Sequence, residues 1–224
     1  MISRTRLPDR MLPAYSFSEE LTNMLTHALG AVMSIAALVL CVIKAAALRS
    51  GVEIAAAAIY GSCLIALYAV SAVYHGLRPR IAKLVMQVID HCTIYILIAG
   101  SYTVVALSAL RQISPVLGWG MVAFQWILAL IAITLTAIDL KAFSGFSMVC
   151  YVGMGWAIAP FIPQVIAALG GRGFGLLLAG GICYTVGAVL YAIGSRRPWF
   201  HSVFHVFVVL GSLLQFLSIY LYAI

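Results

Sequence analysis

The sequence predicts an all-α integral membrane protein: a seven-transmembrane helix bundle with its N-terminus in the cytoplasm and its C-terminus outside. Hydrophobic residues make up 64% of the 224 residues and charged residues only 8%, whereas soluble domains carry about 25% charged residues. Seven apolar segments are each long enough to cross ~30 Å of hydrocarbon at ~1.5 Å per residue. The sequence lacks the ten-residue alternation of apolar and polar positions that is typical of a transmembrane β-barrel.

The expected helices lie near residues 21–47, 52–76, 83–108, 114–138, 144–168, 173–194 and 199–223. Short connections that contain charge, Gly or Pro separate them, such as Arg49-Ser50-Gly51 and Arg78-Pro79-Arg80. Consecutive helices are therefore expected to be antiparallel neighbours in a single domain over residues 19–224. Residues 1–18 are polar and are expected to form a short cytoplasmic tail. The first apolar run is longer than the core of a signal peptide, so we interpret it as a spanning helix.

The distribution of Lys and Arg predicts the orientation. With the N-terminus inside, nine basic residues fall on the inner face: Arg4, Arg6, Arg10, Arg78, Arg80, Lys83, Lys141, Arg196 and Arg197. Four fall on the outer face: Lys44, Arg49, Arg111 and Arg172. Cytoplasmic loops carry the excess of Lys and Arg, which supports a cytoplasmic N-terminus. The net charge of +7 is spread over helix ends in this way and does not indicate nucleic-acid binding.

Cysteine usage excludes a disulfide framework. The five cysteines are odd in number, lie singly inside apolar segments and form no CxxC pair. We interpret them as small residues of the membrane-embedded core.

A strip of glycines marks the sixth segment. Gly173, Gly180, Gly187 and Gly194 recur every seven residues. Small residues let membrane helices approach closely, so tight packing is the favoured interpretation; the wall of a lipid-accessible cavity is the alternative. Pro160 and Pro163 are expected to kink the fifth segment toward its outer end.

Two histidines in the last segment are the clearest chemical signal. His201 and His205 are four residues apart, so they share one face of a helix and can reach one metal ion. A hydrogen-bonded pair or a proton relay would also account for them. His75 near the end of the second segment supplies a third imidazole. Three neutral imidazoles and a water form an open zinc site, so we predict His75, His201 and His205 as ligands.

The depth of these groups in the membrane agrees with a shared site. His75 lies about 5 Å inside the level of Arg78, and His201 and His205 lie about 6 and 12 Å inside that of Arg197. Asp90 lies about 10 Å inside Lys83 by the same measure. All of these anchors belong to the predicted cytoplasmic side, so the polar groups are expected to meet in one leaflet.

Two further residues are candidates for catalysis. Asp90 is expected to orient or deprotonate a water molecule as a general base. Ser71 precedes His75 by one helical turn and could hydrogen-bond that water or a substrate carbonyl. Ser71 could equally bond a backbone carbonyl within its own helix.

Other polar residues have less specific interpretations. His91 follows Asp90 and points about 100° away from it, so it is expected to bond a neighbouring helix or face the interface. Glu20, Asn23 and His27 share a face of the first segment and form a polar seam at its cytoplasmic end. Structural bracing and a functional role are both open for that seam.

The chain resembles the hemolysin III family, the bacterial branch related to the progestin and adiponectin receptors. Five ordered motifs carry the resemblance: Glu20-x-x-Asn23-x-x-Thr26-His27, Ser71-x-x-x-His75, Asp90-His91 leading into Ile98-Ala99-Gly100-Ser101-Tyr102-Thr103, Met154-Gly155-Trp156, and His201-x-x-x-His205 running into Phe207-Val208-Val209-Leu210-Gly211. They extend over residues 16–216, almost the whole chain. Val104, where a Pro is common, and Gln215 depart from the family pattern and lie outside the proposed site.

The resemblance implies a seven-helix fold with zinc near the cytoplasmic face and a place in the bacterial inner membrane. It implies the same three His ligands, His75, His201 and His205, and assigns the family's Ser and Asp to Ser71 and Asp90. The wider superfamily is described as membrane-embedded metal-dependent hydrolases. The resemblance does not supply a substrate.

The leading functional hypothesis is a zinc-dependent hydrolase that cleaves an amide or ester bond of a membrane lipid in the cytoplasmic leaflet. The alternative is a non-catalytic sensor or receptor-like protein of membrane homeostasis with a structural zinc site. A transporter or channel is disfavoured because the outer half offers no charged path. Imidazole ligands suit zinc, but also copper, nickel and iron. The sequence does not indicate an oligomeric state.

Overall fold

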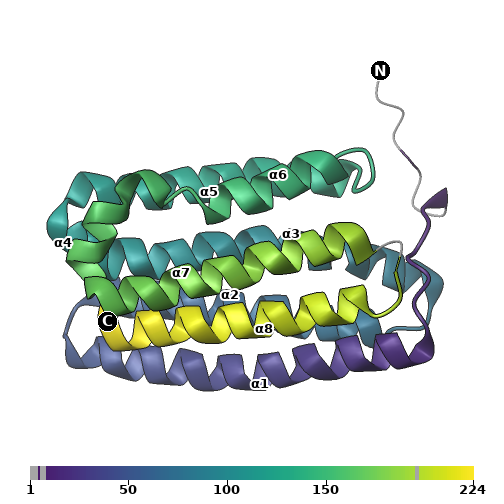
Figure 1. Ribbon diagram of the computed structural model, residues 1–224, viewed down its shortest axis with the longest axis horizontal. Helices are drawn as coiled ribbons and strands as arrows, with labels where there is room; N and C mark the ends of the chain where they lie inside the picture. The colour runs from purple at the N-terminus through teal and green to yellow at the C-terminus, as the bar shows by residue number, and fades with distance from the viewer. Residues whose placement is uncertain (1–4, 6–8, 195–196) are drawn as a thin grey trace.

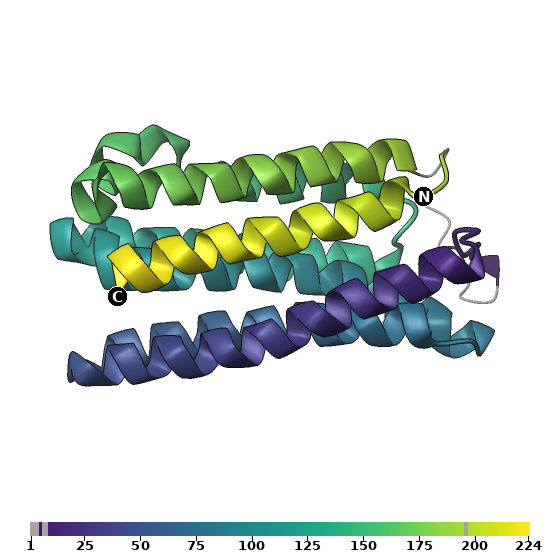
Figure 2. The same cartoon turned by 60° about the horizontal axis from the view of Figure 1, so that its bottom comes forward.

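Long helices lie roughly parallel to one axis in the computed structural model, which describes residue 5 and residues 9–194 and 197–224 (Figures 1 and 2). Six helical stretches are long and apolar enough to cross a membrane: Phe17–Ala47, Gly51–Gly76, Arg80–Ile113, Pro115–Ile138, Ser144–Gly194 and Phe200–Ala223. The described part of the chain contains no strand. The prediction of an all-helical membrane protein is therefore confirmed.

The elements follow one another with short connections. In chain order they are α1 (Phe17–Ala47), α2 (Gly51–Gly76), α3 (Arg80–Val105), the π-helical segment η2 (Ala106–Leu110), α4 (Arg111–Ile113), α5 (Pro115–Ile138), α6 (Ser144–Gly155), the 3₁₀ turn η3 (Ala159–Phe161), α7 (Ile162–Gly194), α8 (Phe200–Ser218) and the π-helical segment η4 (Ile219–Ala223). The short connections agree with the expectation from the sequence.

Helix α1 begins at Phe17, four residues before the predicted start near 21. Ser16 and Glu19 form a capping box there: the Glu19 N–H donates to Ser16 Oγ at 3.3 Å, and the Ser16 N–H donates to Glu19 Oε2 at 2.9 Å. These bonds satisfy N–H groups that have no partner within the helix. A polar residue pair thus extends the helix beyond the apolar run from which its start was predicted.

The predicted segment 144–168 is not one continuous helix and needs correction. Helix α6 ends at Gly155, and η3 and α7 follow it. Pro160 lies in η3 and, like every proline, lacks the N–H that would continue an α-helical ladder. The predicted gap at 169–172 does contain a break, because α7 consists of two helical parts that meet across a kink at Gly170, whose φ of 68° and ψ of 168° are not helical. Figure 1 shows the chain running away from the N-terminal end in α6 and back toward it in α7.

The helices surround the span Arg80–Ile113, which is mostly buried, whereas little of the span Ser144–Gly194 is fully buried. Helix α3 contacts α2, α5 and α6, and α8 contacts both α7 and α1. The first and last long helices therefore lie side by side. Large apolar side chains on the outer faces, such as Leu29, Leu130 and Val189, are exposed, as expected for surfaces that face lipid.

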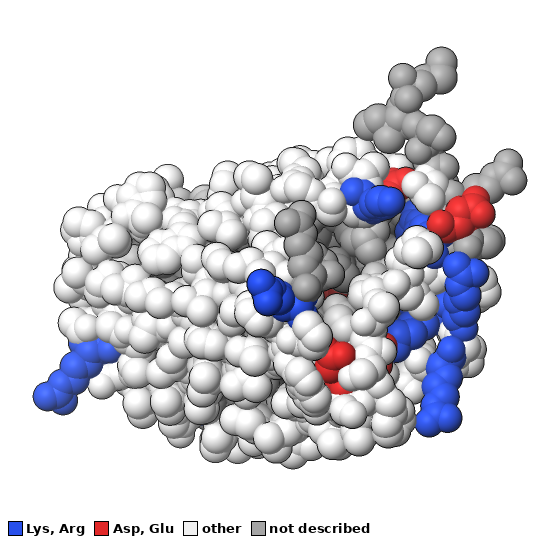
Figure 3. Space-filling view, turned by 45° about the vertical axis from the view of Figure 1, so that its right-hand side comes forward, with Lys and Arg blue, Asp and Glu red and all other residues white. Residues whose placement is uncertain are grey.

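Basic side chains gather at the end of the bundle where α1 begins (Figure 3). The described basic residues at the termini of elements on this end are Arg10, Arg78, Arg80, Lys83, Lys141 and Arg197. Arg4, Arg6 and Arg196, which were counted with them, lie outside the described residues. The opposite end carries Lys44, Arg49, Arg111 and Arg172. The two ends thus differ in their number of described Lys and Arg residues in the predicted direction.

The described part of the N-terminal segment packs against this basic end. The Thr5 N–H donates to Asp139 Oδ2 at 2.7 Å, between α5 and α6. Arg10 is buried and its Nη2 donates to the Ile138 carbonyl at 3.2 Å. The Arg10 carbonyl in turn accepts from Arg80 Nη2 at 3.2 Å. The predicted tail therefore crosses the end of the bundle.

Asp139 is stabilised in its ionised form. Its carboxylate accepts the backbone N–H groups of Ala142 at 3.0 Å, Thr5 at 2.7 Å and Lys141 at 3.1 Å. These bonds lower the pKa of the Asp139 carboxyl from 3.8 to about 2, with the Ala142 N–H the largest cause. Hydrogen bonds to a charged group favour that charge.

The strip of glycines on α7 faces α8. A Cβ atom added at Gly180 would lie 2.7 Å from Gln215 Cγ and 2.9 Å from the Gly211 carbonyl oxygen. At Gly173 it would lie 2.8 Å from Tyr222 Cβ. The favoured interpretation of the strip, close helix packing, is confirmed.

Candidate metal centre

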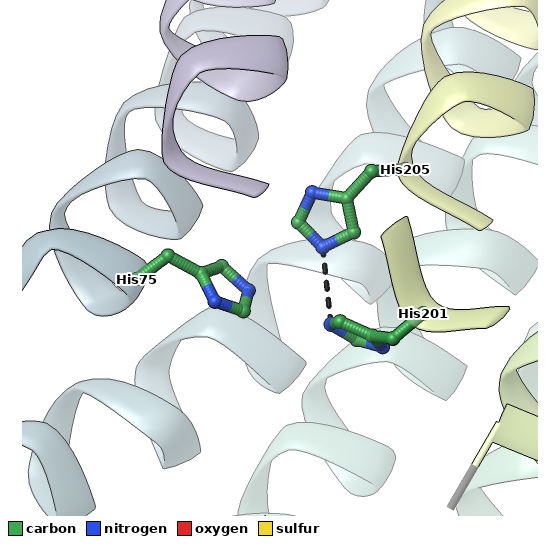
Figure 4. A group of neighbouring side chains, drawn as sticks. All are labelled: His75, His201 and His205. Atoms are coloured by element: carbon green, nitrogen blue, oxygen red, sulfur yellow. Dashed lines mark hydrogen bonds between the residues drawn. The ribbon is translucent and has the colours of Figure 1, made fainter. Parts of the chain in front are cut away.

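Three imidazoles converge at the basic end of the bundle. His75 lies in the last turn of α2, and His201 and His205 lie in the first turns of α8 (Figure 4). All three side chains are buried, and one nitrogen of each lies within 4.8 Å of the other two. His201 Nε2 and His205 Nε2 are 3.1 Å apart. The structure thus brings together the three residues predicted as ligands.

Helix periodicity explains why α8 presents both of its imidazoles inward. His201, His205, Val208 and Ser212 are spaced by three or four residues and are all buried. Val203, Val206 and Leu210 on the other side are exposed to the membrane. An apolar outer face and a polar inner face are the expected result when lipid is the solvent. The depth argument from the sequence depended on the rise per residue, and the three imidazoles do meet.

The protonation of His75 leaves one nitrogen free to bind an ion. His75 Nδ1 is 2.7 Å from Glu20 Oε2 on α1, and Glu20 Oε1 is 2.6 Å from Lys83 Nζ on α3. An ionised carboxylate can only accept, so Nδ1 is the donor of this bond, and in the neutral imidazole this tautomer leaves the lone pair on Nε2. That Nε2 atom is buried and has no hydrogen-bond partner among the described residues. A carboxylate behind the far nitrogen is the common arrangement around histidine ligands of metals.

The spacing of the other two nitrogens also fits a metal ion. Two nitrogens bound at ~2.0–2.1 Å with tetrahedral angles would be roughly 3.3 Å apart. The observed 3.1 Å between the Nε2 atoms of His201 and His205 is close to that value, and it is also the distance of a hydrogen bond between the two rings, drawn as a dashed line in Figure 4. The residues present therefore fit a divalent ion with imidazole ligands.

The proposed catalytic residues lie in the wall of one cavity beside the imidazoles. Asp90 on α3 is half-buried, and Ser71 on α2 is buried. Both line the cavity that His201 and His205 also line, and Ser71 is a polar neighbour of the Asp90 carboxylate. Their roles as base and hydrogen-bond donor remain predictions.

This cavity has a volume of about 180 Å³ and a largely apolar lining. It begins under Pro13 and Tyr15 at the basic end and includes Gln215 on α8. The 14 positions from His201 to Gln215 correspond to about 21 Å of helix. A smaller cavity of about 70 Å³ shares Tyr102, Trp156, Gly181 and Gln215 with it, among other residues. The space beside the imidazoles is therefore long, narrow and apolar.

His27 is part of the same cluster, although it was not predicted as a ligand. Its ring stacks on that of His205, with centroids 3.7 Å apart and planes at 22°. The side chain is buried, and neither ring nitrogen has a hydrogen-bond partner among the described residues. Asn23, one turn earlier, is likewise buried with both amide atoms unpartnered in the described part of the chain. The polar seam thus faces a proposed ligand, and its role stays open.

His91 bonds a neighbouring helix, as expected. Its Nδ1 donates to the Gln87 carbonyl at 2.8 Å, which leaves Nε2 to accept from the Tyr191 hydroxyl of α7 at 3.0 Å. The closest approach of His91 Nδ1 to Asp90 Oδ2 is 3.9 Å. Both His91 nitrogens are occupied, which agrees with its exclusion from the ligand set.

Sequence reasoning missed several residues around the site. Lys83 was treated only as an anchor at the membrane surface, and Tyr15 and Tyr191 were not singled out. Tyr15 stacks on His201, with centroids 4.8 Å apart and planes at 18°. Only Lys83 carried a signal in the sequence, as a charge inside the span of a buried helix.

The fold and the site define a multi-pass helical membrane protein with a buried histidine cluster that could hold a metal ion. The model of the family described as "Haemolysin-III related" matches residues 15–216, and the chain belongs to this family. It is 38% identical to hemolysin-3 of Bacillus cereus over 207 residues, 92% of each chain. It is 35% identical to a hemolysin-3 homolog of Bacillus subtilis (strain 168) over 210 residues, 94% of this chain and 97% of that one.

A more distant similarity extends to animals. The chain is 27% identical to the human monocyte to macrophage differentiation factor over 173 residues, 73% of this chain and 68% of that protein. The resemblance inferred from the five motifs is thereby confirmed.

Proposed function

We propose that this protein is a metal-dependent hydrolase that cleaves an amide or ester bond of a membrane lipid in the cytoplasmic leaflet. One observation carries the proposal: three buried imidazole nitrogens converge within 4.8 Å of one another, beside an apolar cavity whose wall also contains Asp90 and Ser71. A carboxylate, a hydroxyl and an open set of imidazole ligands are the groups that metal-assisted hydrolysis uses.

His75, His201 and His205 would hold the ion, and three neutral imidazoles with an open fourth position are a ligand set of catalytic zinc sites. A divalent ion at this position supplies Lewis acidity, which polarises a carbonyl and lowers the pKa of water. Glu20 keeps the proton on His75 Nδ1, so that Nε2 remains a ligand.

Asp90 would serve as the general base. Its carboxylate accepts a proton from the attacking water as the water oxygen adds to the carbonyl carbon of the lipid. When the C–N or C–O bond breaks, Asp90 returns that proton to the leaving nitrogen or oxygen, and a fatty acid and an amine or alcohol are released. The Ser71 hydroxyl would hold Asp90 or the carbonyl oxygen in place.

The shape of the cavity supports a lipid as the substrate. The apolar residues Ile94, Leu97, Ile98 and Val208 line it away from the imidazoles. An acyl chain could lie among them while the carbonyl group reaches the polar end. Met148 and Val152 of α6 and Thr185 of α7 line the same cavity, so a lipid could enter between these helices from the membrane.

The proposal includes a seven-pass topology with a cytoplasmic N-terminus in the bacterial inner membrane. The reversal of direction between α6 and α7 (Figure 1) supports two passes in the stretch Ser144–Gly194. The six described basic residues at the end that carries the imidazoles, against four at the other, support its placement in the cytoplasm.

The first experiment measures the metal content of detergent-purified protein beside His205→Ala. About one zinc per chain in the wild type and its loss in the variant are expected. Lipid amides and esters are then tested as substrates, with Asp90→Ala as the variant that should retain metal and lose turnover. Equal turnover in wild type and Asp90→Ala would exclude Asp90 as the base.

A second candidate function is a non-catalytic sensor with a structural metal. The ligand set and its partners favour it in one respect, because they connect four helices: Glu20 on α1, His75 on α2, Lys83 on α3 and the two α8 histidines. In that case metal removal lowers the unfolding temperature, and no lipid tested is turned over by the metal-loaded protein.

A further inference from the structure

Glu19 makes contacts in two directions from the first turn of α1. Its Oε1 accepts the backbone N–H of Trp199 at 2.7 Å, at the start of α8. Its Oε2 accepts the N–H of Ser16 at 2.9 Å and the Ser16 hydroxyl at 2.8 Å. Glu19 is buried, and each of its carboxylate oxygens accepts a hydrogen bond from the protein. The carboxylate therefore joins the start of α1 to the start of α8.

The backbone at Trp199 depends on such a contact. Trp199 has φ 66° and ψ −11°, a left-handed conformation that non-glycine residues seldom adopt. It is the N-cap residue of α8, and His201 follows two residues later. An anion near the N-terminus of a helix is also favourable because of the helix dipole. The direction in which α8 leaves this residue determines where the imidazole of His201 lies.

Glu19 acts on His201 by a second route as well. Tyr15 precedes Ser16, and its ring stacks on the imidazole of His201 at 4.8 Å. The bond from the Ser16 N–H to Glu19 Oε2 fixes the backbone directly after Tyr15. The same carboxylate thus restrains the helix that carries the ligand and the ring that covers it.

We propose that Glu19 is a positioning residue for the metal ligand His201, acting through the Trp199 backbone and through Tyr15. The inference rests on the metal site of the proposed function but not on catalysis. The two adjacent carboxylates would then position different ligands. Glu20 orients His75 directly, and Glu19 positions His201 through the Trp199 backbone and Tyr15. A helix turns by about 100° per residue, which lets consecutive carboxylates serve ligands on different helices.

The test compares zinc affinity and thermal unfolding in full-length, detergent-purified variants, with zinc delivered by a competing chelator. Glu19→Ala removes both contacts and is expected to weaken zinc binding by about tenfold, at the lower end of the ~10–100-fold loss typical for outer-shell partners. Glu19→Gln keeps an acceptor oxygen for the Trp199 N–H but replaces Oε2 by an NH₂ group that cannot accept the Ser16 N–H, so its zinc affinity is expected to lie between those of the wild type and Glu19→Ala.

Glu53→Ala is the matched control. Glu53 is a buried carboxylate at the opposite end of the bundle, 3.5 Å from Arg111 Nη2 and 3.2 Å from Gln112 Nε2. Its loss is expected to lower the unfolding temperature equally with and without zinc and to leave zinc affinity unchanged. In Glu19→Ala the rise in unfolding temperature that zinc causes should shrink, because this rise depends on affinity.

If Glu19→Ala alone folds poorly, the same substitution is tested in a second variant, Trp199→Gly. Glycine adopts the left-handed conformation without steric cost, so Trp199→Gly should make the start of α8 less dependent on Glu19. The loss of zinc affinity caused by Glu19→Ala is then expected to be smaller in Trp199→Gly than in the wild type.

Two outcomes would overturn the inference. In the first, Glu19→Ala leaves zinc affinity unchanged, as Glu53→Ala is expected to do. In the second, Glu19→Ala lowers zinc affinity by the same factor in the Trp199→Gly background as in the wild type. A wild-type chain that binds zinc but hydrolyses no lipid would remove the enzyme proposal and leave this inference standing. A wild-type chain that binds no divalent ion would overturn both.

Discussion

The contact between α7 and α8 allows a sharp test with two adjacent glycines. Gly180→Ala would place a Cβ atom 2.7 Å from Gln215 Cγ and 2.9 Å from the carbonyl oxygen of Gly211. The Gln215 side chain can rotate away, but the Gly211 oxygen belongs to the backbone of α8. Relief of that contact therefore requires the two helices to separate. Gly181→Ala meets no atom within 4 Å and serves as the control.

The magnitude follows from two opposing terms. Alanine in place of glycine favours a helix interior by up to about 1 kcal/mol, and both variants share this gain. Overpacking costs typically about 1–3 kcal/mol and applies only to Gly180→Ala. We therefore expect Gly181→Ala to be as stable as the wild type or slightly more stable, and Gly180→Ala to be about 1–3 kcal/mol less stable than Gly181→Ala.

Reversible unfolding in mixed micelles, followed by circular dichroism, measures this difference. A Gly180→Ala variant that is at least as stable as Gly181→Ala would refute the close packing of α7 on α8. The same displacement should weaken metal binding, because α8 carries His201 and His205. A destabilised Gly180→Ala with unchanged zinc affinity would show that the start of α8 is held independently of its packing on α7.

Three further predictions concern other parts of the molecule. The hydrogen bonds to ionised Asp139 lower its pKa and stabilise the fold. This stabilisation is complete above the unfolded pKa of 3.8 and is lost as the pH falls through about 2. Hydrogen exchange of the N-terminal segment between pH 5 and pH 2 should show this dependence in the wild type and not in Asp139→Asn. Ser212 accepts the Tyr68 hydroxyl at 2.6 Å and lies 2.7 Å from that of Tyr184. Because the Tyr68 hydroxyl also lies 3.1 Å from the Val208 carbonyl, Ser212→Ala leaves mainly the Tyr184 hydroxyl without a partner and should lower the free energy of unfolding by about 1–3 kcal/mol; an unchanged value would mean that the Tyr184 hydroxyl finds another partner. Removal of divalent ions with a chelator should lower the unfolding temperature of the wild type but not that of His205→Ala, and equal shifts would argue against a site at this residue.

Much of the candidate site could be predicted because helix geometry is regular. The four-residue spacing of His201 and His205 determines their shared face, and the basic residues at the helix ends set the depth of His75 relative to them. These relations depend on one helix at a time or on the membrane surface. They do not require knowledge of how the helices pack.

The other parts of the site depend on how different helices pack against one another, which the spacing of residues within one helix does not reveal. Glu19 and Glu20 are adjacent in sequence, yet they reach α8 and α2, respectively. Tyr191 looks like any aromatic residue of an apolar helix until α7 is placed beside α3. The break at Gly170 was predicted from local sequence, because glycine can adopt the positive φ that separates the two helical parts of α7.

The contact between α1 and α8 has a consequence for the order in which the protein is made. More than half of the chain separates His75 from His201, and chains emerge from the ribosome with the N-terminus first. Glu20 and His75 can meet as soon as the first two helices are inserted, but the cluster lacks two of its three imidazoles until the last helix enters the membrane. Assembly of the three predicted ligands therefore waits for α8, and a chain in which α8 is missing or not inserted would present His75 alone of the three.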